Sequence, residues 1–96
     1  GAVLRVDRFG NLVTNIPRAM VERLASRGAI RITAGPTSVD SLVETYAGVP
    51  PGTICALFGS SDHLEIAENG GDAARRLGLA PGASVDVVRL SDAVLG

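Results

Sequence analysis

The chain has 96 residues, of which 46% are hydrophobic but only 3% aromatic, so aliphatic side chains must build its core. This length predicts a single domain spanning residues 1–96, large enough to fold without disulfide staples. The formal net charge of −1, with nine scattered arginines and no lysine, gives no general electrostatic reason to bind nucleic acid.

The single cysteine, Cys55, excludes an intramolecular disulfide and a metal site built on cysteine pairs. It lies within the apolar run TICALF, which predicts a small buried thiol. No apolar run approaches the roughly 20 residues that span a bilayer, and no signal-peptide pattern opens the chain. We therefore expect a cytoplasmic protein with no membrane partner. The opening GAVLRV reads like a strand already under way, which indicates a domain excised from a longer protein.

The first half of the chain predicts three strands and one helix. The β-rich segments are residues 2–7, 11–16 and 29–34. A turn at Phe9 and Gly10 separates the first two segments. The stretch PRAMVERLASRG then changes to helical spacing, which predicts a short amphipathic helix. We expect this helix to begin at Pro17 and to be capped at its C-terminus by Gly28.

The second half of the chain is also mainly β-rich. The predicted strands are one or two within residues 38–49, then 53–59, 64–69 and 84–90. The continuous apolar run of residues 53–59, which follows the rigid Pro50-Pro51-Gly52 turn, predicts a central strand. A second short helix is expected between Asp72 and Gly78. Because β-α units do not alternate, the pattern favours an antiparallel barrel or sandwich over a Rossmann-like sheet. We expect a mainly β, Greek-key-type antiparallel barrel with two short helices.

The stretch Ser60-Ser61-Asp62-His63 contains the residue types of a hydrolytic triad without their geometry. A triad needs its members to converge in space with the base oriented by a third group, and four consecutive residues do not provide this. The stretch instead predicts a polar hairpin turn. One histidine with scattered carboxylates matches no metal-ligand spacing, and no phosphate-binding glycine motif is present. We assign no catalytic residue and no metal ligand in this chain.

The stretch DRFGN near the N-terminus concentrates hydrogen-bonding capacity beside an aromatic ring. The planar amide of Asn11 can read an adenine edge, and an aromatic ring such as Phe9 can stack on a base. Tyr46 is a second candidate stacking platform. From the residues alone, two interpretations stay open: a base-binding site, or core aromatics beside a turn that Asn11 caps.

Two longer stretches together resemble a known family. DRFGNLVTNI (7–16) and ALFGSSDHLEIAENGGDAARRLGLAPG (56–82), with TYAGVPPG (45–52) before the second, resemble the C-terminal domain of the S-adenosylmethionine hydrolases. These enzymes, also called SAM hydroxide adenosyltransferases, are related to the fluorinase and the chlorinase. The resemblance covers nearly the whole chain and keeps the order and spacing of the family's motifs.

The resemblance implies one domain of a two-domain enzyme that forms homotrimers. The ligand would lie between the N-terminal domain of one subunit and the C-terminal domain of its neighbour, a β-barrel with some likeness to an OB-fold. The reaction would be hydrolysis of S-adenosylmethionine to adenosine and L-methionine, with no metal or separate cofactor. The catalytic groups belong to the N-terminal domain, which this chain lacks, so we expect the isolated chain to be inactive.

The resemblance also implies substrate-binding roles for five residues around the base. Asn11 matches the asparagine that reads the adenine, and Phe9 matches an aromatic residue beside it. Tyr46 falls near the ring that stacks on the base. Asn69 and Gly70 lie where backbone groups contact the base.

At the methionine end, the resemblance implies roles for three further residues. Asp7 resembles the carboxylate that binds the ammonium group. Ser60 matches a serine that binds the carboxylate of methionine, with help from the main chain of Ser61. The fluorinase-like relatives have arginine at the positions of Ser61 and Glu68, and the departure here favours a hydrolase over a halogenating enzyme.

Two other classes of function are consistent with the residues to different degrees. A non-enzymatic β-barrel that serves oligomerisation or binds a small ligand would make DRFGN a structural turn. An OB-like nucleic-acid binder is disfavoured, because the charge is nearly neutral and aromatic residues are sparse.

Overall fold

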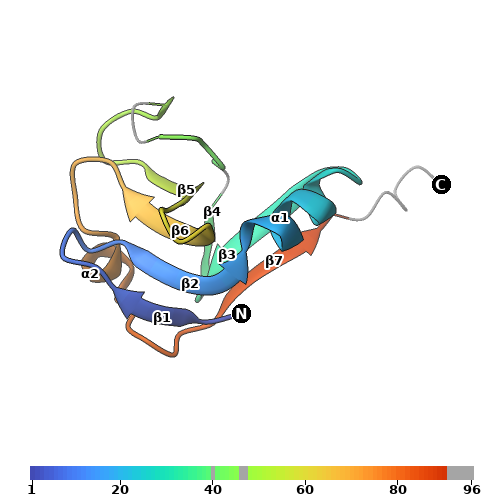
Figure 1. The fold of residues 1–96 in the computed structure, drawn as a ribbon. Coiled ribbons are helices and arrows are strands. Elements are labelled where there is room, and N and C mark those ends of the chain that lie inside the picture. The colour runs from blue at the N-terminus through green and yellow to red at the C-terminus, as the bar shows by residue number, and fades with distance from the viewer. Residues whose placement is uncertain (40, 46–47, 91–96) are drawn as a thin grey trace.

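The computed structural model describes residues 1–39, 41–45 and 48–90. The strands are β1 (Val3–Val6), β2 (Leu12–Pro17), β3 (Ile30–Ala34), β4 (Thr37–Val39), β5 (Ile54–Phe58), β6 (His63–Glu68) and β7 (Val85–Arg89). The helices are α1 (Arg18–Ala25) and α2 (Ala73–Leu77). Figure 1 shows α1 beside β7, and α2 at the end of the sheet where the β1–β2 turn lies. No helix in these residues is long and apolar enough to cross a membrane.

The described strands form two sheets, one with the order β1-β2-β6-β5 and one with the order β4-β3-β7. Every pairing between these strands is antiparallel. The prediction of a mainly β, antiparallel fold with two short helices is therefore confirmed. Within the described residues the strands form two separate hydrogen-bonded sheets and not one closed barrel.

The apolar strand β5 was expected at the centre of its sheet, but β6 occupies the inner position and β5 ends the strand order. Its outer side is lined by residues 41–43, where Val43 N donates to the Ala56 carbonyl at 2.8 Å and Ala56 N to the Ser41 carbonyl at 2.7 Å. The two faces of β5 are buried in different clusters, with Ala56 in the main core and Cys55 in a second one. Burial of both faces explains the continuous apolar run without a central position.

The main core joins the two sheets and α1 through aliphatic side chains. Its fully buried members include Leu12, Val21, Leu64, Ile66 and Val85. A smaller cluster on the other face of β5 and β6 contains Cys55, Leu57 and Ala67. The predicted burial of Cys55 is confirmed, and burial raises the pKa of its thiol.

Both predicted ends of α2 are confirmed. For α1, Pro17 lies at the start of the helix as predicted, but the predicted C-cap is not the observed one. Asp72 caps α2 by accepting a hydrogen bond from Arg75 N at 3.0 Å, and Gly78 ends it in the left-handed conformation at φ 69°. The expected Gly28 cap of α1 is wrong, because Ser26 forms the C-cap in a right-handed conformation at φ −68°. Because the C-cap of α1 is Ser26, two residues before Gly28, the end of the helix requires no residue in the left-handed conformation.

Candidate functional site

The turn between β1 and β2 is organised by Asp7. Its Oδ1 accepts hydrogen bonds from Phe9 N at 2.9 Å and from Asn11 N at 3.0 Å. Its backbone closes the same turn, because Asp7 N donates to the Asn11 carbonyl at 3.0 Å and Gly10 N donates to the Asp7 carbonyl at 2.9 Å. These four bonds fix the backbone of Asn11 on both sides.

Gly10 joins this turn to the N-terminal end of α2. Its φ of 85° lies in the left-handed region, and a Cβ there would overlap the carboxyl group of Asp72. The Gly10 carbonyl accepts a hydrogen bond from Ala74 N at 2.9 Å. The close approach that glycine permits therefore brings the β1–β2 turn next to the loop that leads into α2.

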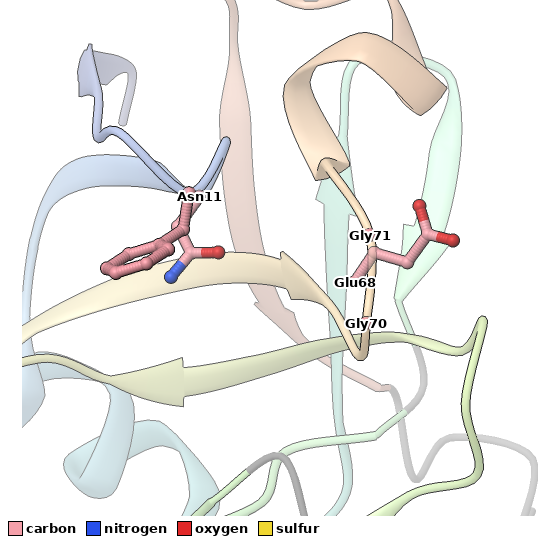
Figure 2. Close-up of a pocket in the computed structure, with 5 residues that line it drawn as sticks. Asn11, Glu68, Gly70 and Gly71 are labelled. Atoms are coloured by element: carbon pink, nitrogen blue, oxygen red, sulfur yellow. The ribbon is translucent and has the colours of Figure 1, made fainter.

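A cavity of about 350 Å³ lies between this turn and the loop after β6 (Figure 2). Its lining is mainly apolar and comes from Phe9, Asn11, Glu68, Gly70 and Gly71. Phe9 is 64% exposed, whereas Asn11 is only 4% exposed. Because Phe9 is exposed, it is not a core residue, and its ring is available to a ligand. One residue pair thus offers an aromatic face beside a buried amide.

The opposite wall of the cavity is formed by Glu68 and the two glycines that follow its strand. The Glu68 carboxylate pairs with Arg76 at 3.0 Å, and Figure 2 shows it extending away from Asn11. A Cβ on Gly71 would overlap the Glu68 carboxyl group, so glycine permits this conformation. The charge of Glu68 is thereby directed away from Asn11 and paired with Arg76.

Asn69 holds the loop in place and does not line the cavity. Its backbone N donates to the Thr53 carbonyl at 3.0 Å, and its carbonyl accepts from Gly52 N at 2.8 Å. Its side-chain Nδ2 donates to the Val49 carbonyl at 2.9 Å. Among the residues expected around the base, the cavity brings together Phe9, Asn11 and Gly70. Tyr46 lies outside the described residues.

Of the three residues expected at the methionine end, Asp7 lies in the β1–β2 turn beside the cavity, whereas Ser60 and Ser61 lie at a different point of the sheet. Ser60 and Ser61 are exposed in the hairpin turn between β5 and β6, which the sequence predicted. The Asp62 carboxylate pairs with Arg18, and the His63 Nδ1 lies 2.8 Å from the carbonyl oxygen of Ser61. Asp62 and His63 are therefore not arranged as parts of a triad. No group of metal-ligating side chains that could hold an ion is found in the part of the chain that the structure describes.

The sequence interpretation did not single out Glu65, which links these regions. Glu65 lies half-buried on β6, and the side chain of Asn11 forms a hydrogen bond with its carboxyl group. Its carboxylate also occupies the space above Gly59, where a Cβ would overlap it. Burial, and secondarily the charge of Asp7, raise the pKa of Glu65, while Arg5 and the Asn11 hydrogen bond oppose this shift. Alternation along β6 predicts that Glu65 lies on the opposite face of the strand from Leu64 and Ile66. It does not predict which side chains Glu65 contacts on that face.

Comparison with known proteins gives a consistent set of relatives. Residues 1–86 match the model of the SAM hydroxide adenosyltransferase C-terminal domain. The chain is 38% identical over 85 residues to the (R)-S-adenosyl-L-methionine hydrolase of Thermus thermophilus, covering 88% of this chain and 30% of that protein. It is 34% identical over 80 residues to the enzyme of the same name from Salinispora tropica, covering 83% of this chain and 29% of that protein.

Two solved structures share the fold. An uncharacterised conserved protein from Thermotoga maritima matches with a TM-score of 0.79 and 30% identity, over 91% of this chain and 35% of the other. A conserved hypothetical protein from Thermus thermophilus matches with a TM-score of 0.74 and 34% identity, over 92% of this chain and 34% of the other. The chain thus spans about a third of the length of each of these relatives.

Proposed function

The chain belongs to the SAM hydroxide adenosyltransferase family, whose C-terminal domain it matches, and on that premise we propose that it binds the adenosine part of S-adenosylmethionine. In this proposal it is the substrate-holding domain of an enzyme that hydrolyses S-adenosylmethionine to adenosine and L-methionine. The catalytic groups belong to a separate N-terminal domain, and the reaction with water requires no metal or separate cofactor.

The observation that carries the proposal is the cavity beside the β1–β2 turn. Its volume of about 350 Å³ is in the range of small-ligand sites. The exposed ring of Phe9 offers a stacking surface worth roughly 1–3 kcal/mol per base. The buried amide of Asn11 offers the paired donor and acceptor that can recognise an adenine edge. An aromatic face and a planar amide on one cavity are the two elements that a purine requires.

The methionine part of the substrate would extend from this cavity toward the Ser60-Ser61 turn. Asp7 supplies negative charge for the ammonium group, and the exposed serines supply donors for the carboxylate. The second wall of the pocket would come from the N-terminal domain of a neighbouring subunit in a homotrimer. Because the sulfonium carries its own leaving group, methionine, positioning and desolvation of the attacking water would do much of the catalysis.

The role of Asn11 is tested by Asn11→Ala in the enzyme that carries this domain. Loss of a paired amide costs about 1–3 kcal/mol, so the affinity for adenosine should fall about tenfold or more, measured by calorimetry. Asn15→Ala is the matched control, because the Asn15 side chain is exposed and accepts a hydrogen bond from Ala2 N at 2.9 Å. Unchanged adenosine affinity in Asn11→Ala would show that Asn11 does not read the base.

The division of labour between domains is tested with the isolated 96-residue chain. It should release no adenosine from S-adenosylmethionine, because the catalytic groups lie elsewhere in the proposed enzyme. The assay is chromatographic detection of adenosine, with the full enzyme as the positive control. Turnover by the isolated chain at a rate near that of the full enzyme would refute the proposal.

An assembly role is the second candidate, and one feature of β1 favours it. Leu4 and Val6 on this strand, which ends the strand order of its sheet, are 58% and 36% exposed, so apolar side chains lie on the surface. Sedimentation velocity of the isolated chain separates the possibilities. A stable trimer would give the domain an assembly function of its own, and a monomer would remove this candidate.

A further inference from the structure

Glu65 and Asn11 lie on the same face of the larger sheet, opposite the main core. Val13 on β2 pairs in register with Glu65 on β6, so their side chains lie on one face. Asn11 precedes Val13 by two residues and therefore points to that face as well. The core residues Leu12 and Ile66 pair with each other and occupy the other face. The sheet thus brings a half-buried carboxylate next to the buried amide of the cavity.

The contact between the two side chains has a defined direction. The hydrogen bond with Asn11 lowers the pKa of Glu65 and so favours the ionised carboxylate, which can only accept, so the part of the Asn11 amide that faces Glu65 is its NH₂ group. Figure 2 shows the carboxamide oxygen of Asn11 on the side of Gly70 and Gly71, across the cavity. The backbone of Asn11 is fixed by its two hydrogen bonds with Asp7. Only rotation about the side-chain bonds of Asn11 remains to be fixed.

We propose that Glu65 is a positioning residue that holds the Asn11 carboxamide in one orientation and so makes the cavity select 6-aminopurines over 6-oxopurines. This inference rests on the proposed binding of adenosine. Gly59 supports it, because only a residue without a Cβ leaves room for the Glu65 carboxylate at this place. Asp7 from the turn and Arg5 from β1 are the charged groups that act on Glu65 here.

The selectivity follows from the hydrogen-bonding groups of the two purines. Adenine presents an amino donor at position 6, whereas hypoxanthine presents a carbonyl acceptor there. An amide that can turn over serves either base, because its oxygen and nitrogen simply exchange places. With its NH₂ group held by Glu65, Asn11 presents its oxygen, which accepts from the amino group of adenine and opposes the carbonyl of hypoxanthine.

The test is a comparison of adenosine and inosine affinity in the enzyme that carries this domain. The wild type should prefer adenosine about tenfold or more, since a mismatched buried acceptor costs at least that factor. In Glu65→Gln, the new amide can face Asn11 with either its oxygen or its nitrogen, so the preference should fall to about threefold or less. Glu22→Gln is the matched control on α1, where the side chain is 62% exposed, and should keep the wild-type preference.

A second variant tests the contact between Glu65 and Asn11 by changing the residue beneath the Glu65 carboxylate. Gly59→Ala should displace the Glu65 carboxylate and lower the adenosine preference without changing Glu65 or Asn11. A wild-type protein that binds neither nucleoside would overturn the proposed function and this inference with it. A wild type that prefers adenosine, with the same preference in Glu65→Gln, would overturn the positioning role alone.

Discussion

Thr14 connects the two inner strands of the larger sheet where their regular pairing is interrupted. The register between β2 and β6 shifts between Val13 and Pro17. In this gap the fully buried Thr14 Oγ1 donates to the Leu64 carbonyl at 2.7 Å and accepts from Ile16 N at 3.1 Å. A side-chain hydroxyl therefore satisfies two buried backbone groups that the ladder leaves unpaired.

The substitution Thr14→Val removes these two hydrogen bonds while keeping the shape of the side chain. Each buried backbone group left without a partner costs about 1–3 kcal/mol, so two should cost about 3 kcal/mol in total. For a domain of this size, that loss corresponds to a fall in Tm of roughly 10–20 °C. The predicted effect is large because both groups are inaccessible to water.

Urea unfolding followed by circular dichroism measures this loss, provided that the m-value stays unchanged. Thr14→Ser is the matched control, because it keeps the hydroxyl and loses one methyl group at a cost of about 1 kcal/mol. If Thr14→Val is no less stable than Thr14→Ser, the hydroxyl does not hold the two strands together and the reasoning fails.

Three further predictions concern other contacts. Gly10→Ala should lower the free energy of unfolding by about 2–3 kcal/mol, because it combines a positive φ with displacement of the Asp72 cap. Gly52→Ala, at φ 83° with open space around it, should lower it by only about 1 kcal/mol. Chemical denaturation compares the two variants. Asp72→Ala should cost about 1 kcal/mol through loss of the α2 cap, measured as a shift in urea midpoint, and an unchanged midpoint would contradict the capping role. Because the folded-state pKa of Glu65 is raised, its stabilising contribution is complete below its ordinary value of 4.5 and is lost as the pH rises through the folded pKa. As the pH rises from 4.5 through the folded-state pKa of Glu65, the wild type should therefore lose stability relative to Glu65→Gln, measured in a pH series of unfolding curves. A constant difference in stability between the two proteins would contradict the raised pKa.

Local sequence signals determined most of the elements of this protein. β-rich segments and one continuous apolar run located most of the strands, and the change to helical spacing located α1. Asp72 and Gly78 marked both ends of α2 correctly, because capping depends only on residues within one turn of the helix. The Gly28 cap failed because Ser26 ended α1 first in a conformation open to any residue.

The motif DRFGN also identified the turn that carries Phe9 and Asn11, although the residues alone left core and ligand-binding interpretations open. The folded chain excludes a core position for Phe9, which is exposed, and shows a cavity beside Asn11; ligand binding there stays a prediction. Glu65 carried no signal of its own, since a glutamate that alternates with core residues is the ordinary pattern of a half-exposed strand.

The sequence by itself therefore determined the elements, the mainly antiparallel β class and the resemblance to the SAM hydroxide adenosyltransferases. The tertiary structure decided that β6 and not β5 lies inside its sheet, that the Glu65 carboxylate lies above Gly59, and that Glu65 interacts with Asn11. The reason is that alternation fixes which face a side chain occupies, whereas its neighbours on that face are set by pairing between strands about 50 residues apart.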